Sequence, residues 1–212
     1  DLKWETTAQA GFGFDFGFAN DRLNGSLDFY HKKTNDLILQ QEAAQPAVQP
    51  FVFSNLDADV INQGVEFALN YDIIQQEDIT WNLGFNVSYN ENEVQNFDGL
   101  IQTGEINGNG LTGAYAQLLA QGQPLFSYYL REFGGFDANG ISIYPNGDVQ
   151  QFVGKSALPD YVVGISTSFS YKRFNMAAYL NGQYGQYIYN NTANAYQTAG
   201  IIASAQNVTT DV

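Results

Sequence analysis

The sequence predicts an all-β fold, arranged as one sector of a large antiparallel transmembrane β-barrel. Apolar and polar residues alternate with a period of two, and these stretches run over roughly 12 residues, about twice the usual strand length. The mean hydropathy is only −0.25, although 44% of the residues are hydrophobic and 15% are aromatic. A membrane barrel has this composition because only alternate residues face lipid, and no run approaches the ~18 apolar residues of a membrane-spanning helix.

The first two long strands are predicted at residues 6–18 and 23–39, joined by a tight turn at residues 19–22. One parity of each strand is apolar and the other is polar or glycine, which indicates a sheet with two unlike faces. The apolar row of the first strand is Ala8, Ala10, Phe12, Phe14, Phe16 and Phe18, and that of the second contains Leu23, Leu27 and Phe29.

Strands three and four are predicted at residues 64–74 and 79–90, with a short polar turn at residues 75–78. Both strands show the same alternation. Trp81 and Tyr89 stand at the two ends of the fourth apolar row, which fits the aromatic girdles that mark the two membrane interfaces of a barrel.

Strands five and six are predicted at residues 161–171 and 174–189, joined by a turn at residues 172–173. Between strands four and five we expect a short helix at residues 112–120. We also expect a hairpin made from residues 124–129 and 141–144. Three long connections separate or follow the hairpins of long strands and are expected to be extracellular loops: residues 40–60, which contain Pro46 and Pro50, residues 91–159 and residues 190–212.

Short turns and long connections therefore alternate, as they do in outer-membrane barrels with short periplasmic turns and long extracellular loops. The lipid-facing side follows from energetics, because a charged residue near the middle of the bilayer costs roughly 2–4 kcal/mol. The opposite assignment places Asp15, Asp28, Glu66 and Asp72 in lipid, so these residues are assigned to the lumen. Six strands cannot close a barrel, so residues 1–212 are expected to be part of one larger barrel domain.

The charge balance argues against nucleic acid as a partner. The chain has 22 acidic and 8 basic residues, a net charge of −14, and such a field repels phosphate backbones. The absence of cysteine removes thiol catalysis, disulfides and cysteine-ligated zinc. Both ends of the chain resemble cuts through a longer protein, because Asp1 leads directly into strand-like sequence and Val212 ends a loop-like segment.

No group of residues suggests catalysis, so we expect a protein that is not an enzyme and holds no cofactor. His31 is the only histidine and has no suitably placed nucleophile near it. Residues 137–140 resemble the start of a calcium loop, but the twelfth position is Asp148 rather than the usual bidentate glutamate. We therefore predict no metal site.

Several runs of the sequence resemble SusC/RagA-type TonB-dependent transporters, and together they cover most of residues 1–190. The most specific run is the opening Leu2-Lys3-Trp4-Glu5-Thr6-Thr7, with Asp15-Phe16-Gly17-Phe18 and the segment 20–37 after it. Residues 137–148 depart from the family pattern. Family members often carry an acidic, glycine-containing loop there, and this chain has only the short runs Asp137-Ala138-Asn139-Gly140 and Asn146-Gly147-Asp148. Further matches are Asn62-Gln63-Gly64-Val65-Glu66, Gly122-Gln123-Pro124, Pro159-Asp160-Tyr161, residues 169–175 and Gly182-Gln183-Tyr184-Gly185.

The resemblance implies a 22-stranded barrel in the outer membrane of a Bacteroidota bacterium, with an N-terminal plug domain that lies outside this chain. It also implies active, TonB-dependent uptake of oligosaccharides or peptides as nutrients. A SusD-like surface lipoprotein is the implied partner, together with TonB and membrane lipid. The transported molecule is either glycan or peptide, and nothing in the residues decides between them.

Two groups of residues are candidates for the path of the transported molecule, because aromatic platforms with nearby amides and carboxylates suit polar ligands. Each has a structural alternative: loop packing or an upper girdle for the first group, and contact with the plug or a neighbouring strand for the second. The loop candidates are Phe126, Tyr128, Tyr129, Tyr144, Tyr187 and Tyr189. The lumen candidates are Asp15, Asp28, Glu66, Asn70 and Asn86.

Two other functions remain open at this stage. One is an outer-membrane barrel that does not import, either porin-like or associated with assembly. The other is a soluble β-sandwich that binds carbohydrate. Strands of only about 5–6 residues would favour the sandwich.

Overall fold

A computed structural model describes residues 2–44, 46–108, 110–139 and 141–196. The chain divides into two compact units. The first comprises Asp1–Phe97 and Pro159–Gly185, and the second comprises Asp98–Leu158 and Gln186–Val212. Among the described residues, no helix is both long and apolar enough to cross a membrane.

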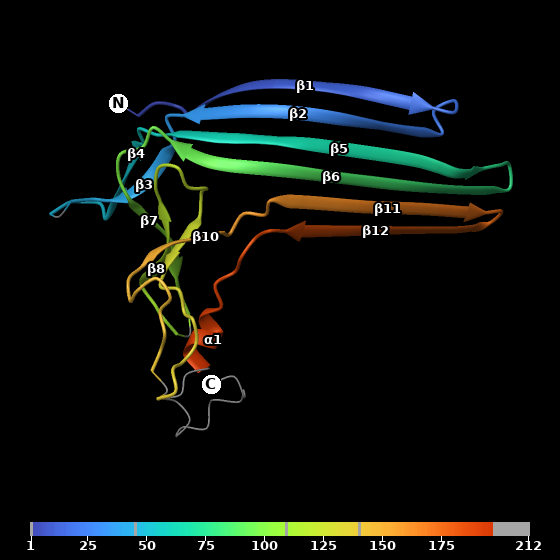
Figure 1. Ribbon diagram of the computed structural model, residues 1–212. Helices are drawn as coiled ribbons and strands as arrows, with labels where there is room; N and C mark the ends of the chain where they lie inside the picture. Colours follow the sequence, from blue (N-terminus) through green and yellow to red (C-terminus); the bar gives the residue numbers. More distant parts are fainter. Residues whose placement is uncertain (1, 45, 109, 140, 197–212) are drawn as a thin grey trace. The chain divides into compact units, whose positions relative to one another are not determined.

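The first unit is built on a six-stranded antiparallel sheet (Figure 1). Its strand order is β1-β2-β5-β6-β11-β12. The six strands therefore lie side by side in the order in which they occur along the chain, although strands of other sheets come between them in the sequence. The strands are β1 (Thr6–Phe18), β2 (Leu23–Asn35), β5 (Asp59–Gln75), β6 (Ile79–Gln95), β11 (Tyr161–Tyr171) and β12 (Phe174–Tyr184).

Four of the predicted strand boundaries are wrong. β2 ends at Asn35 because Asp36 adopts a left-handed conformation, with φ 54°, that breaks the ladder. The residues after it form a separate two-stranded hairpin inside the predicted loop 40–60, made of β3 (Ile38–Glu42) and β4 (Phe51–Asn55). β12 ends at Tyr184, before Gly185 at φ 92°.

β5 and β6 are longer than predicted, with 17 residues each. Their extra residues pair with each other, as Val60 does with Val94, and Val60 also pairs with Thr34 of β2. The alternation that predicts a strand fades here because adjacent residues are buried together, Val60 at 3% and Ile61 at 8% exposure. Backbone pairing therefore continues past the point where the sequence pattern stops.

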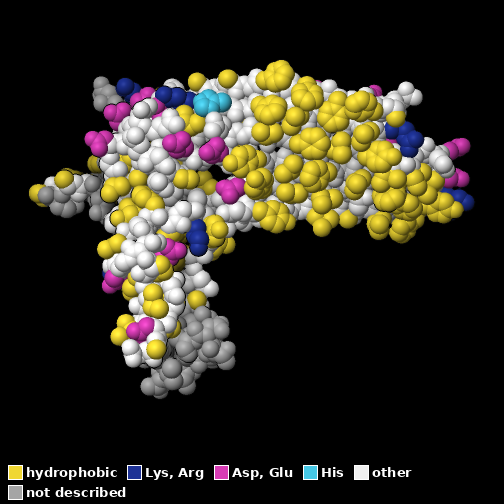
Figure 2. Space-filling model, viewed as in Figure 1, with side chains coloured by type: hydrophobic (Ala, Val, Ile, Leu, Met, Phe, Trp, Pro, Cys, Tyr) yellow, Lys and Arg dark blue, Asp and Glu magenta, His cyan; other side chains and the backbone are white. Residues whose placement is uncertain are grey.

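The register places every apolar row on one face of the sheet. Residues directly opposite one another share a face, and one such row runs Phe12, Phe29, Val65, Tyr89, Tyr161 and Tyr184 across all six strands. Figure 2 shows hydrophobic side chains gathered over this sheet, and many are exposed, such as Phe12 at 70% and Leu180 at 60%. An exposed apolar face this continuous marks a surface that meets lipid or another apolar partner.

Strand length completes the membrane interpretation. The shortest of the six strands has 11 residues, which at ~3.3 Å per residue gives roughly 36 Å, enough to cross an apolar band of about 25 Å at a tilt near 45°. The soluble β-sandwich is therefore ruled out by strand length. Trp81 and Tyr89 bound the apolar row of β6, and Tyr161 of β11 stands directly opposite Tyr89. The ends of β5 and β6 at residues 59–64 and 90–95 lie past this tyrosine pair and so extend beyond the membrane.

Two of the three short turns contain left-handed residues of the kind found in tight hairpins. Ala19, Asn20 and Asp21 are all left-handed, with φ between 56° and 61°. Lys172 opens a two-residue loop between Tyr171 and Phe174 at φ 52°. Positive φ values at hairpin turns match the right-handed twist of the flanking strands.

The second unit contains a four-stranded antiparallel sheet of order β10-β9-β8-β7. Its strands are β7 (Ile101–Ile106), β8 (Ala114–Leu119), β9 (Ser127–Leu130) and β10 (Gln151–Ser156), and a short helix α1 (Asn191–Tyr196) follows later in the chain. Ile106, Ala116 and Tyr128 form its buried cluster, against which Leu130, Val153 and Tyr189 pack among others.

Three expectations for this unit differ from the structure. Residues 112–120 do not form a helix, because Ala114–Leu119 pairs with β7 along its length and the sheet contacts override the helix propensity of alanine and leucine. β9 pairs with β8 and β10 rather than with residues 141–144, for which the described part of the chain shows one isolated bridge, between Ser142 and Phe136. Residues 190–212, expected as a loop, contain α1, and residues 197–212 lie outside the described part.

Candidate functional site

All five lumen candidates lie on the polar face of the six-stranded sheet and are exposed: Asp15, Asp28, Glu66, Asn70 and Asn86. Asp28 of β2 stands directly opposite Glu66 of β5. Like charges opposite one another destabilise a sheet, and the ion pairs found in the described part of the chain involve neither carboxylate. This face is therefore acidic as well as polar.

Glycines on the neighbouring strands make room for these lumen side chains. A Cβ atom at Gly13 would collide with the carboxylate of Asp28, and one at Gly164 would lie 2.7 Å from Oδ1 of Asn86. Asp28 and Asn86 therefore lie over the glycines of the adjacent strands.

A polar hollow of about 510 Å³ brings two lumen candidates, Asp15 and Asn70, together near the turn between β1 and β2. Asn70 Nδ2 is 3.5 Å from Oδ1 of Asn24, and Asn24 Nδ2 donates to the carbonyl of Asp21 at 2.8 Å. Asp28, Glu66 and Asn86 do not line this hollow. Its residues are Asp15, Phe16, Gly17, Asp21, Asn24, Gly25, Ser26, Ala68 and Asn70.

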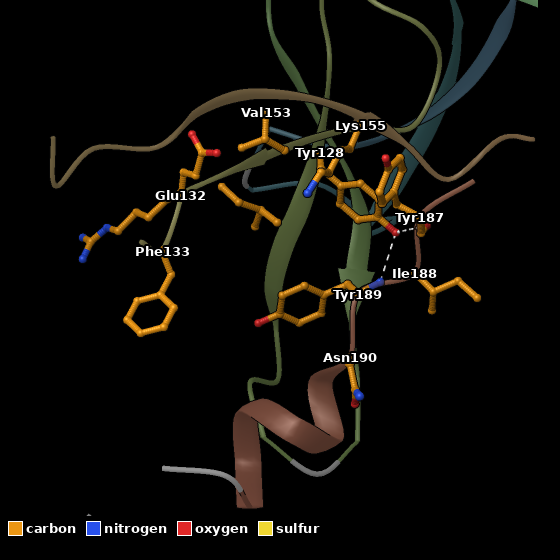
Figure 3. Close-up of a pocket in the computed structure, with 11 residues that line it drawn as sticks. Tyr128, Glu132, Phe133, Val153, Lys155, Tyr187, Ile188, Tyr189 and Asn190 are labelled. Atoms are coloured by element: carbon orange, nitrogen blue, oxygen red, sulfur yellow. Dashed lines mark hydrogen bonds between the residues drawn. The ribbon is translucent and has the colours of Figure 1, made fainter. Parts of the chain in front are cut away.

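A second site, in the four-stranded unit, brings three loop candidates together in one pocket of about 330 Å³ (Figure 3). Tyr128 comes from β9, whereas Tyr187 and Tyr189 come from the segment before α1, 59 and 61 residues later in the chain. We call this the tyrosine pocket. It is lined by Tyr128, Leu130, Arg131, Glu132, Phe133, Val153, Lys155, Tyr187, Ile188, Tyr189 and Asn190.

The hydroxyl of Tyr128 joins the two walls of the tyrosine pocket. It donates to the carbonyl of Tyr187 at 2.9 Å and accepts from the backbone N–H of Tyr189 at 3.3 Å, as the dashed lines in Figure 3 show. Tyr128 is only 6% exposed. Its role is thus to position the segment 187–189 rather than to offer a free hydroxyl.

Charged side chains at the tyrosine pocket were missed by the sequence analysis. Lys155 of β10 places Nζ 4.9 Å from the ring centre of Tyr187, a cation–π contact. Arg131 pairs with Asp148 at 2.9 Å, and Glu132 accepts from Asn146 Nδ2 at 2.6 Å. One signal could have found the two cations, because Arg131 and Lys155 are the only basic residues between positions 34 and 171.

The other three loop candidates lie elsewhere. Tyr129 packs edge-on against Phe152 at 5.0 Å and lines a different hollow, of about 350 Å³, together with Gln117 and others. Phe126 is an exposed turn residue with φ 58°, and Tyr144 is half-buried and lines neither hollow. Chain proximity in a loop therefore did not predict which aromatic side chains share a site.

The residues considered for metal binding and proton transfer have other contacts. Asp137 Oδ1 accepts the backbone N–H groups of Ile141 and Asn139, both at 2.8 Å, and these bonds hold the pKa of Asp137 below its usual value. Asp148 pairs with Arg131. The described residues contain no cluster of three or more metal-ligating side chains. His31 is exposed, with Nδ1 3.3 Å from Oε1 of Gln63.

Comparison with known proteins identifies the family. A family model described as "TonB dependent receptor-like, beta-barrel" matches residues 1–208. The chain belongs to this family. TonB-dependent receptors of this kind are integral outer-membrane proteins rather than enzymes, which accords with the lipid-facing sheet described above.

Similar proteins support the SusC/RagA type. The chain is 27% identical to "TonB-dependent receptor SusC" of Bacteroides thetaiotaomicron over 96% of its length, and 38% identical to "TonB-dependent receptor P39" of Formosa agariphila over 71%. Among solved structures, "Structure of the RagAB peptide transporter" matches with a TM-score of 0.71 and 26% identity over 90% of the chain. The predicted resemblance to SusC/RagA-type TonB-dependent transporters is therefore confirmed.

The chain spans only part of these relatives. It covers 22% of the SusC receptor, 14% of receptor P39 and 22% of the RagAB chain. The all-β barrel fold is confirmed for this TonB-dependent receptor, while the total of 22 strands and the separate plug domain remain predictions.

Proposed function

We propose that the protein containing this chain is an active importer of oligosaccharides or peptides across the outer membrane. In this proposal TonB supplies the energy, a SusD-like surface lipoprotein covers the barrel, and the chain is part of a C-terminal barrel domain that surrounds a plug. The observation that carries it is the two-faced sheet, apolar throughout on one side and acidic and amide-rich on the other, in a chain of the TonB-dependent receptor family.

The two hollows support import over a purely structural barrel. The hollow near Asp15 and Asn70 lies on the lumen face, and the tyrosine pocket lies on the segment between β6 and β11 and after β12. Polar groups beside aromatic side chains are what glycans and peptides both require of a binding surface.

The proposal is tested by uptake in the native bacterium. Deletion of the full gene is expected to abolish uptake of at least one labelled oligosaccharide or peptide, and deletion of tonB is expected to have the same effect on that molecule. The intact gene supplied in trans is the control and should restore uptake.

A non-importing barrel gives a different result. If uptake across the panel is unchanged by the gene deletion, the import proposal is wrong. If uptake falls but is independent of TonB, the protein is porin-like instead.

A further inference from the structure

We propose that the tyrosine pocket binds the carboxyl-terminal end of a peptide, with Lys155 as the residue that recognises the carboxylate. This proposal rests on the proposed function, because it names the chemistry that one site of the importer selects. It is carried by a cation that makes no ion pair among the described residues, an apolar wall, and the hydrogen bonds of Tyr128 to the segment 187–189, all in the four-stranded unit.

Lys155 has no acidic partner among the described residues, although the chain as a whole is strongly acidic. The ion pairs of the described part of the chain are Lys33 with Asp59 and Arg131 with Asp148, so no described carboxylate lies within salt-bridge distance of Lys155. Its contact is with the ring of Tyr187, 4.9 Å from the ring centre. Glu132 also lines the pocket, but it accepts from Asn146 and forms no ion pair with Lys155. The ammonium is therefore available to an anion from outside.

The second cation at the pocket is already neutralised. Arg131 pairs with Asp148 at 2.9 Å, and Glu132 is held by the amide of Asn146. Lys155 is thus the lining cation that makes no ion pair among the described residues.

The wall beside Lys155 is aliphatic. Leu130 and Val153 pack against the buried cluster of Ile106, Ala116 and Tyr128, and Ile188 is exposed at the rim. Figure 3 shows Val153 and Tyr189 on opposite sides of the space that Lys155 also borders. A volume of about 330 Å³ is near the lower end for pockets that hold small ligands.

These walls favour a peptide terminus over an acidic sugar. Sugars stack on open aromatic faces and need hydrogen bonds around their rim. Lys155 occupies one face of the Tyr187 ring, and the hydroxyl of Tyr128 is committed to two backbone groups. An aliphatic side chain next to a carboxylate fits the combination of Val153, Leu130 and Lys155. That pairing is what the C-terminal residue of a peptide provides.

The experiment measures binding to the purified full-length protein together with any subunit that co-purifies. The probes are the peptide Ala-Ala-Ala-Leu as the free acid, the same peptide as the C-terminal amide, and trigalacturonate as an acidic sugar. The variants are Lys155→Met, Lys155→Arg and the matched control Lys172→Met, since Lys172 also lies over a tyrosine ring, 5.4 Å from that of Tyr171, but in the other unit.

The free acid is expected to bind about fivefold more tightly than the amide, the upper end for a partly exposed ion pair. Lys155→Met should abolish this preference, whereas Lys155→Arg and Lys172→Met should keep it. Equal binding of acid and amide by the wild type, or a preference that survives in Lys155→Met, overturns the proposal. So does Lys155-dependent binding of trigalacturonate without binding of the peptide.

Failure of this site and failure of the importer give distinct results. If gene deletion abolishes uptake but Lys155→Met leaves the acid preference intact, the site is wrong and the importer stands. If gene deletion leaves all uptake unchanged, the importer itself is wrong, whatever Lys155 binds.

Discussion

At the scale of single residues, Asp59 ties together three strand ends outside the membrane. Its carboxylate accepts from Lys33 Nζ at 2.7 Å and from the side-chain amides of Asn35 and Asn96. The ammonium of Lys33 and the amide of Asn96 hold the pKa of Asp59 below its usual value. Asp59 is 7% exposed, so few water molecules compete for these contacts.

Asp59→Asn is expected to destabilise this region by about 1–3 kcal/mol at pH 7, because Lys33, Asn35 and Asn96 lose their charged acceptor. A depressed pKa contributes stability that is complete above the unfolded-state value near 4 and is lost as pH falls through the folded-state value. The difference between wild type and variant should therefore shrink below about pH 4. Hydrogen exchange at residues 59–62 and 92–96 of the full-length protein measures it.

Asp57→Asn is the matched control for this prediction. Asp57 is exposed, and surface substitutions of this kind usually change stability by less than about 0.5 kcal/mol. Equal effects of the two variants, or a difference that persists unchanged at pH 3, would contradict the role assigned to Asp59.

At the scale of the strand, two adjacent residues of β5 test which face meets lipid. Phe67 lies on the apolar face between Phe16 and Phe85, with ring centres 6.5 Å and 6.3 Å away. Glu66 lies on the lumen face opposite Asp28. The same substitution at these two positions thus places the same charge in opposite environments.

Phe67→Lys is expected to cost roughly 2–4 kcal/mol of folding free energy in a bilayer, the cost of a lysine facing lipid near the midplane. Glu66→Lys should be neutral or stabilise by up to about 1 kcal/mol, since it replaces a like-charge pair by an opposite-charge pair. Urea titration of the full-length protein in lipid vesicles, followed by the gel-mobility shift of folded barrels, compares them. A larger cost for Glu66→Lys would reverse the assignment of the two faces.

At the scale of the whole molecule, the six-stranded sheet has two open edges. β1 pairs only with β2 and β12 only with β11 among the described strands. Unpaired backbone groups in lipid cost several kcal/mol each, so a membrane sheet of this kind is stable only within a closed ring. The sheet therefore requires further strands on both sides.

Residues 1–212 expressed alone are accordingly expected not to insert into vesicles as a monomer, whereas the full-length protein should. The measurement is the gel-mobility shift of a folded barrel after refolding into lipid, with protease resistance as a second readout. A protease-resistant monomer of the isolated chain would show that its edges close without additional strands.

Much of the fold could be predicted from the sequence because alternation is a local property. Each side chain of a strand faces lipid or lumen according to its parity, so the rows through Phe12 and Val65 could be read without any knowledge of partners. The alternation did not predict the strand at Val60 and Ile61, because both residues are buried beyond the membrane. It also did not predict the strand Ala114–Leu119, where pairing with β7 outweighs helix propensity.

The sequence by itself therefore determined the strand class, the lipid-facing side and the family resemblance carried by the opening hairpin. Only the tertiary structure decided that Tyr187 and Tyr189 meet Tyr128 and that Lys155 lies over Tyr187. The physical reason is sequence separation: contacts between residues some 60 positions apart depend on strand pairing and loop path. Strand pairing and loop path produce no periodic pattern in the sequence. A strand that crosses the membrane, in contrast, alternates apolar and polar residues because every second side chain faces lipid.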